Sequence, residues 1–264
     1  MKIGLAMYSL HRMFQEGTLD PADSPQFCVE KLGIRLLDPT YPLMPLTDAG
    51  FRSRFKANAD AAGAVISTLA VGREGDLAAV RDDERRKAVR NHQKWFDIAG
   101  ELGAYAFRAN TGGPDKPNSD AVNRCIDSFS QLARMGETTG IKVMIENHGG
   151  LSRLPAPICH IIEGVNSEYL GTVPDFGNFA DDIRYEALKR VVPYAIAMHA
   201  KTKEFKGEQH VSYNLDLCMK ICKEAGYRGD VSIEFEGPVG GPDQPADEAD
   251  GILRSKKLLE ACAW

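Results

Sequence analysis

The stretch 142–148, which reads Lys-Val-Met-Ile-Glu-Asn-His, decides the fold. Successive side chains of a strand point to opposite faces, so Val143 and Ile145 share one face. Glu146 and His148 share the other face and stand at the carboxyl end of the run. One apolar face and a polar carboxyl end are typical of a strand in a parallel barrel, which packs helices outside and holds its chemistry at one mouth.

Three other strand-like runs have the same alternation. The polar residues at their carboxyl ends are Arg108 and Asn110 in 104–110, His199 and Lys201 in 194–201, and Glu234 and Glu236 in 231–236. Asp175 follows a further run at 170–174. Because parallel strands end at the same mouth of a barrel, we expect these side chains to lie close together.

Strand-like runs alternate with stretches of helical period along all 264 residues. The runs are 2–9, 34–37, 64–71, 104–109, 142–146, 170–174, 194–199 and 230–235. Glycine follows the last apolar turn of several helical stretches, as is typical where helices end; these glycines are Gly33, Gly63, Gly103, Gly140 and Gly226.

Eight strand–helix units in a chain of about 250 residues indicate an α/β fold of the (β/α)8, or TIM barrel, type. No linker or shift of composition divides the chain, so we expect one domain over 1–264. A doubly wound open sheet is the alternative. It normally carries Gly-x-Gly-x-x-Gly after the first strand, whereas 8–11 here reads Tyr-Ser-Leu-His.

The composition excludes several functional classes. A net charge of −5 argues against a protein that binds nucleic acid. No apolar run approaches the ~18 residues that span a membrane, and the apolar start reads as a strand rather than a signal peptide. The six cysteines show no Cys-x-x-Cys spacing, which favours reduced thiols and a cytoplasmic protein.

Glu146, Asp175, His199 and Glu234 form the most informative group, with one residue from each of the last four strands. Each acidic residue alone is as well explained by solvation or a salt bridge. Three converging carboxylates, however, repel one another unless some take up protons or a cation binds among them. The oxygen ligands favour Mn²⁺ or Mg²⁺, and the histidine makes Co²⁺, Fe²⁺ and Zn²⁺ compatible as well.

The runs around these four residues resemble the xylose isomerase-like barrel superfamily. They are Val-Met-Ile-Glu-Asn-His-Gly-Gly, Val-Pro-Asp-Phe-Gly-Asn, Met-His-Ala-Lys and Ser-Ile-Glu-Phe-Glu-Gly, at 143–150, 173–178, 198–201 and 232–237. The group includes sugar isomerases, ketose 3-epimerases, inosose dehydratases and endonuclease IV. The resemblance implies one divalent cation, with Mn²⁺ the expected ion, on Glu146, Asp175, His199 and Glu234.

The resemblance also implies that Glu146 and Glu234 act as acid and base on the two faces of a keto-sugar. Proton removal beside the carbonyl then gives an enediolate that the metal stabilises, as in an isomerase or epimerase. Endonuclease IV needs further histidines that this chain lacks; it has Asn178 where a histidine often stands. A DNA-repair role is therefore not expected.

His148 and Lys201 depart from the epimerase pattern and keep a second activity open. The lysine is more like the dehydratase branch, which implies a metal-dependent lyase acting on a keto-inositol or an oxidised glycoside. Lys201 is then placed to neutralise an enolate oxygen and His148 to protonate a leaving hydroxyl. A surface lysine and a loop-fixing histidine are the alternative interpretations, and a sugar-binding barrel without catalysis is a third function.

Arg108, Asn110 and Glu236 are the expected substrate-binding residues. Arg108 is equally compatible with a structural ion pair, and Glu236 with a cap on the barrel mouth. The expected substrate is a small sugar or polyol, and the sequence leaves its identity and its phosphorylation open. The oligomeric state is also open, although members of the family often form homo-oligomers.

Overall fold

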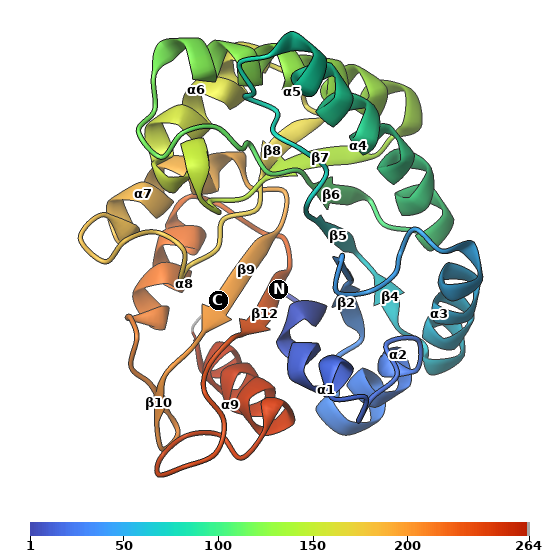
Figure 1. Ribbon diagram of the computed structural model, residues 1–264. Helices are drawn as coiled ribbons and strands as arrows, with labels where there is room; N and C mark the ends of the chain where they lie inside the picture. Colours follow the sequence, from blue (N-terminus) through green and yellow to red (C-terminus); the bar gives the residue numbers. More distant parts are fainter. Residues whose placement is uncertain (263–264) are drawn as a thin grey trace.

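The computed structural model describes residues 1–262, whose main strands form a parallel barrel enclosed by helices (Figure 1). The barrel strands are β1 (Ile3–Ala6), β2 (Leu36–Asp38), β4 (Val65–Ile66) with β5 (Thr68–Val71), β6 (Ala106–Arg108), β7 (Lys142–Ile145), β8 (Leu170–Thr172), β9 (Met198–Thr202) and β12 (Val231–Phe235). Successive strands pair in parallel, and β12 pairs with β1. The α/β barrel fold is thereby confirmed.

The barrel is continuous at the two places where one sheet passes into the other. β4 pairs with β2 and β5 pairs with β6, so the single residue between them, Ser67, joins the two sheets. On the opposite side, parallel bridges link Thr172 to Ala195 and Asp175 to His199. The second bridge brings two of the predicted site residues next to each other through the backbone.

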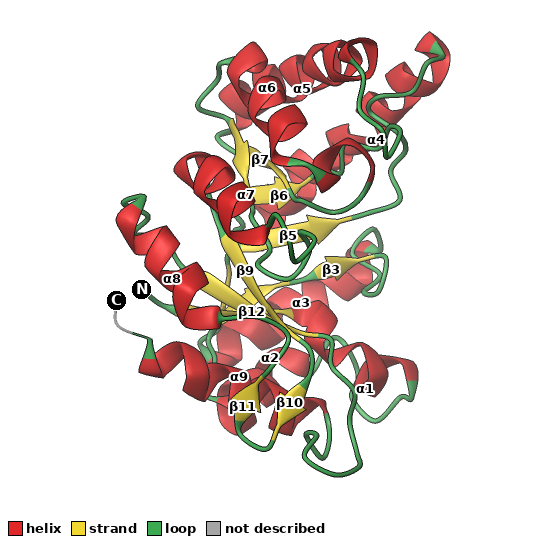
Figure 2. Cartoon of the chain, turned by 90° about the vertical axis from the view of Figure 1, so that its left-hand side faces the viewer, coloured by secondary structure: helices red, strands yellow, loops and turns green. Residues whose placement is uncertain are grey.

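Helices cover the outside of the strands (Figure 2). They are α1 (His11–Gln15), α2 (Ser24–Phe27), α3 (Ala49–Ala62), α4 (Asp82–Leu102), α5 (Ser119–Thr139), α6 (Pro155–Val165), α7 (Arg184–Val191), α8 (Leu215–Glu224) and α9 (Glu248–Ala261). Two short additions lie at the strand ends: β3 (Thr40–Tyr41) pairs with β5, and β10 (Phe205–Lys206) forms a hairpin with β11 (Gln209–His210). No helix within residues 1–262 is long and apolar enough to cross a membrane.

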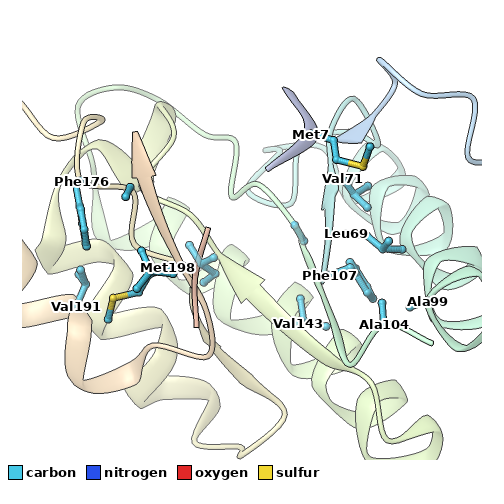
Figure 3. Close-up of a cluster of buried hydrophobic side chains, with 14 of the residues drawn as sticks. Met7, Leu69, Val71, Ala99, Ala104, Phe107, Val143, Phe176, Val191 and Met198 are labelled. Carbon is cyan, nitrogen blue, oxygen red and sulfur yellow. The ribbon is translucent and has the colours of Figure 1, made fainter. Parts of the chain in front are cut away.

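The alternation of side chains along each strand produces two separate hydrophobic cores. Phe107, Val143 and Met198 belong to the large core between strands and helices, where Figure 3 shows Phe107 beside Leu69. A second, small core fills the barrel interior, and it consists of Ala106, Met144, Val173 and Ala197. This separation is the one that the sequence pattern predicts, and it directs the polar strand ends toward the barrel axis.

The predicted helix ends are confirmed by left-handed backbone at all five glycines, with φ between 60° and 79°. This conformation is strained for residues with a Cβ atom, so glycine ends the helix at Gly63 and Gly103 without that strain. The run 2–9 is shorter as a strand than predicted. It ends at Ala6, because Met7–Leu10 forms a turn of 3₁₀ helix.

Truncating Phe107 tests the core between strands and helices. Phe107 is fully buried, and its ring meets Phe96 edge-on at 4.9 Å between centroids. We expect Phe107→Ala to lower the free energy of unfolding by about 3–5 kcal/mol, since it leaves a cavity. Urea unfolding measures this loss. The control Val80→Ala, at a side chain that is 80% exposed, is expected to change stability by less than about 0.5 kcal/mol; equal losses would contradict the placement of Phe107.

Candidate metal centre

Four predicted site residues meet at the carboxyl end of the barrel, each delivered by a different strand. Glu146 follows β7, Asp175 follows β8, His199 lies in β9 and Glu234 lies in β12. One ligand atom from each lies within 4.8 Å of the others. Glu146 and Asp175 are completely buried, and His199 and Glu234 are 2% and 6% exposed.

The His199 ring has carboxylates on both of its sides. Its Nδ1 is 3.8 Å from Oε1 of Glu146 and 3.7 Å from Oε2 of Glu234. Its Nε2, on the other side of the ring, is 3.9 Å from Oδ2 of Asp38 at the end of β2. Nδ1 is therefore the nitrogen that faces the carboxylates of the cluster.

Two buried cations accompany the carboxylates. The guanidinium of Arg108 donates to Oε2 of Glu146 and, through Nε, to the carbonyl of Val71 at 3.2 Å. The ammonium of Lys201 lies 3.2 Å from both Glu234 and Glu236 and 3.5 Å from Asp175. Lys201 is 2% exposed, so the surface-lysine interpretation is wrong.

Backbone and amide hydrogen bonds fix the carboxylates in place. The side chain of Asn147 donates to the Asp175 carbonyl at 2.9 Å and accepts from its N–H at 2.7 Å. The Gly177 N–H donates to Oδ1 of Asp175 at 2.7 Å. The Asn178 amide donates to Oε1 of Glu146 at 3.3 Å. Loops after β7 and β8 thus hold each other and orient two of the four side chains.

The electrostatic environment shifts the pKa values of Glu146 and Asp175 in opposite directions. Burial by itself raises the pKa of Glu146, but the charges of Arg108 and His199 lower it well below its ordinary value. Burial raises the pKa of Asp175, and the negative charge of Glu234 raises it further. The charge of Lys201 opposes this change, but the pKa of Asp175 still lies well above its ordinary value. Asp175 is therefore the carboxyl that takes up a proton when no cation is bound.

The basic groups respond to the same crowding of negative charge. Burial would lower the pKa of His199, but Glu146 and Glu234 raise it to about 9. Burial likewise opposes the charged form of Lys201, and Asp175 and Glu234 more than compensate, so its pKa is raised. Without another cation, protons on His199 and Asp175 therefore offset part of the negative charge of the cluster.

The donor atoms left over fit a divalent cation. Within residues 1–262, Oδ2 of Asp175, Oε2 of Glu234 and both ring nitrogens of His199 are buried without a hydrogen-bond partner. Buried polar atoms without partners are costly and rare. Three carboxylates and one imidazole are a donor set suited to Mn²⁺, Mg²⁺ or Zn²⁺, so Glu146, Asp175, His199 and Glu234 could hold one such ion.

A cavity of about 760 Å³ adjoins the cluster. Gly177 and Asn178, which touch Asp175 and Glu146, form part of its wall. The remaining lining residues are Asp115, Lys116, Arg153, Leu154, Phe179, Ala180, Asp181, Ile183, Arg184, Lys203, Glu204, Ser212 and Tyr213. The cavity has room for a small ligand, and Gly177 and Asn178 connect its wall to the buried carboxylates.

The predicted substrate-binding and auxiliary residues do not all join the cluster. Arg108, Lys201 and Glu236 contact it, as described. Asn110 is half-buried, and its Oδ1 finds no hydrogen-bond partner in residues 1–262. His148 is exposed; its backbone N–H donates to Ser152, while within the described chain its ring forms no hydrogen bond or ion pair with the cluster.

Two features of this site are not among the sequence-based predictions: Asp38 beside His199, and the hydrogen bond of Asn178 to Glu146. Asp38 ends β2 in the same way that Glu146 follows β7, so the alternation applied to 36–38 could have found it. Asn178 lies in the loop after β8, and no local pattern shows that its amide reaches Glu146.

A family model described as the xylose isomerase-like TIM barrel matches residues 29–261, so the chain belongs to this family. Among curated proteins, none matches the sequence significantly.

Solved structures of the same fold cover nearly the whole chain. The 3-keto-D-glucoside 4-epimerase YcjR from E. coli is 16% identical over 99% of this chain and 100% of its own, with a TM-score of 0.76. The D-psicose 3-epimerase from Clostridium cellulolyticum, solved with D-tagatose, is 17% identical over 98% and 97%, with a TM-score of 0.76. The IolI protein, solved with zinc, is 17% identical over 98% and 96%, with a TM-score of 0.75. These similarities establish the fold.

Binding of Mn²⁺ is expected to strengthen as the pH rises. The ligand forms are a neutral imidazole and ionised carboxylates, whereas the raised pKa values of His199, about 9, and of Asp175 favour their protonated forms. Binding therefore releases protons, and affinity falls as the pH drops below about 9. Calorimetric titrations with Mn²⁺ in buffers of different ionisation enthalpy count these protons. An affinity that stays constant between about pH 6 and about pH 8 would contradict this arrangement.

Proposed function

We propose that this protein is a divalent-metal-dependent sugar isomerase or epimerase that moves a proton next to a carbonyl group. The observation that supports the proposal best is the buried set of Glu146, Asp175, His199 and Glu234, with ligand atoms that lack other partners. Mn²⁺ is the proposed ion. The catalytic unit is the one barrel domain of 1–264 in a cytoplasmic protein, which in this proposal assembles as a homo-oligomer.

The two glutamates are the proposed acid and base. Glu146 and Glu234 come from strands separated in the barrel order by β8 and β9, and both approach the same His199 nitrogen. A bound cation supplies Lewis-acid polarisation of the substrate carbonyl and stabilises the charge of an enediolate. One glutamate takes the proton from carbon, and the other returns it on the opposite face in an epimerase. Return by the same glutamate gives an isomerase.

The neighbouring polar groups are proposed to orient the substrate. Arg108 and Lys201 are fixed donors beside Glu146 and Glu234, where they can hold hydroxyl oxygens and oppose developing negative charge. Asn110 has a free buried carbonyl oxygen, and Glu236 is half-buried at the rim, so both suit sugar hydroxyl groups. His148 is proposed to exchange protons between the site and solvent.

The substrate is proposed to be an unphosphorylated ketose, a keto-inositol or a 3-keto-glycoside. Relatives of the same fold act on D-psicose and on a 3-keto-D-glucoside, according to their names. The cavity beside Asn178, of about 760 Å³, leaves space for parts of a substrate that extend beyond one sugar ring.

A lyase of the same fold is the second candidate, and the position of Lys201 favours it. An ammonium group buried against Glu234 and Glu236 is a fixed positive counter-charge at the site. After the same proton abstraction, it can stabilise an enolate while His148 protonates a departing group. Release of water or of an aglycone, detected by mass spectrometry of the products, distinguishes this activity from isomerisation.

Exchange of substrate hydrogen with solvent tests the shared first step. Incubation of the Mn²⁺ protein in D₂O with the proposed substrates is expected to place deuterium at the carbon beside the carbonyl, as NMR and mass spectrometry will show. We expect Glu146→Gln and Glu234→Gln to slow this exchange by a factor of about 10²–10⁴ or more, because each removes a proton acceptor.

The exposed Glu224, which forms an ion pair with Lys220 at 3.8 Å on α8, provides the matched control. Glu224→Gln is expected to exchange at the wild-type rate. An absence of deuterium across the ketoses, keto-inositols and 3-keto-glycosides would refute both the isomerase and the lyase proposals.

A further inference from the structure

Asp38 lies on the side of His199 that the candidate metal ligands do not reach. It is the last residue of β2 and is 2% exposed. Glu146 and Glu234 approach Nδ1 of His199, whereas Oδ2 of Asp38 faces Nε2 at 3.9 Å. The imidazole therefore stands between the cluster and a fourth buried carboxylate.

Asp38 is held by one of its two oxygens. The Ser67 hydroxyl and the Thr68 N–H, the latter at 3.1 Å, both donate to Oδ1. Ser67 is the residue that separates β4 from β5, so the junction of the two sheets carries this anchor. With Oδ1 occupied twice, Oδ2 is left directed at His199.

His199 needs an acceptor at this position. A neutral imidazole carries one N–H and one lone pair, and only the lone pair can bind a cation. If Nδ1 faces the cation, Nε2 must carry the hydrogen, and Nε2 is buried without a hydrogen-bond partner in the described chain. Metal-binding histidines usually donate their second N–H to a carboxylate or carbonyl, which fixes the ring and its tautomer.

We propose that Asp38 is a positioning residue that accepts the Nε2–H of His199 and so presents Nδ1 to the cation. A movement of roughly 1 Å closes the present separation to the length of an ordinary hydrogen bond. The proposal rests on the metal site of the proposed function and is independent of the reaction that follows. Ser67 supports it by orienting the Asp38 carboxylate.

Metal affinity separates this role from a merely structural one. We expect Asp38→Ala to bind Mn²⁺ about 10–100-fold more weakly by calorimetric titration, the usual cost of losing such a partner. Ser67→Ala, which leaves the Thr68 N–H in place, is expected to lose less. Asp38→Asn is expected to lose about as much as Asp38→Ala, because its oxygen is held by Ser67 and Thr68 and its NH2 group then faces the Nε2–H without accepting it. Circular dichroism and thermal unfolding without Mn²⁺ verify that each variant folds.

Asp48 provides a matched control for general destabilisation. Its side chain caps α3 by accepting from the Phe51 N–H, far along the chain from the cluster. Asp48→Ala is expected to lower the unfolding temperature with Mn²⁺ affinity unchanged. A structural role for Asp38 alone would make Asp38→Ala behave in the same way.

The tautomer of His199 gives a second readout. In the Zn²⁺-loaded protein, long-range ¹H–¹⁵N NMR is expected to show His199 protonated at Nε2, with an N–H that exchanges slowly. In Asp38→Ala, this hydrogen is expected to exchange faster with water, since its acceptor is gone.

The Mn²⁺ affinity of Asp38→Ala tests the role of Asp38 independently of the proposed reaction. A folded Asp38→Ala variant that binds Mn²⁺ within twofold of the wild type overturns the role of Asp38, even if sugars are turned over. A loss of affinity in this variant supports the role even if no sugar reacts. A wild-type protein that binds neither Mn²⁺ nor Zn²⁺ overturns both proposals.

Discussion

Repulsion between buried carboxylates governs the mouth of this barrel. Glu146, Asp175 and Glu234 gather around one imidazole with almost no exposure to water. At an effective dielectric constant of about 20, two like charges ~4 Å apart repel by ~4 kcal/mol. Lys201 and Arg108 offset part of this repulsion. Burial and the charge of Glu234 together still raise the pKa of Asp175, and a divalent cation at the unpartnered oxygens would oppose both effects.

The barrel imposes this crowding through strand register. β9 and β12 pair in parallel with Glu234 directly beside Lys201, and a bridge sets Asp175 beside His199. Paired residues in neighbouring strands point to the same face, so these four side chains converge whatever their charges. The backbone thus places acids together, and the interleaved lysine limits the cost.

This register also explains how far the sequence could predict the site. Alternation placed Lys201 correctly because it lies inside β9, and Glu236 because it follows β12 by one residue. It does not position His148, since β7 ends at Ile145 and His148 is exposed in the loop that follows, so its role stays a prediction. Contacts between loops, such as that of Asn178 with Glu146, and the joining of two sheets at Ser67 depend on distant parts of the chain that no local pattern encodes.

The fixed cations also limit what this mouth can bind. The Lys201 ammonium already lies among Asp175, Glu234 and Glu236, so a second divalent ion there would have to displace it. The charges of this mouth therefore favour one divalent cation over two. A substrate that becomes an enediolate adds further negative charge, which the carboxylates oppose. Arg108 and Lys201 are the described lysine and arginine side chains that contact the cluster, so the proposed proton abstraction would depend on them as well as on the cation.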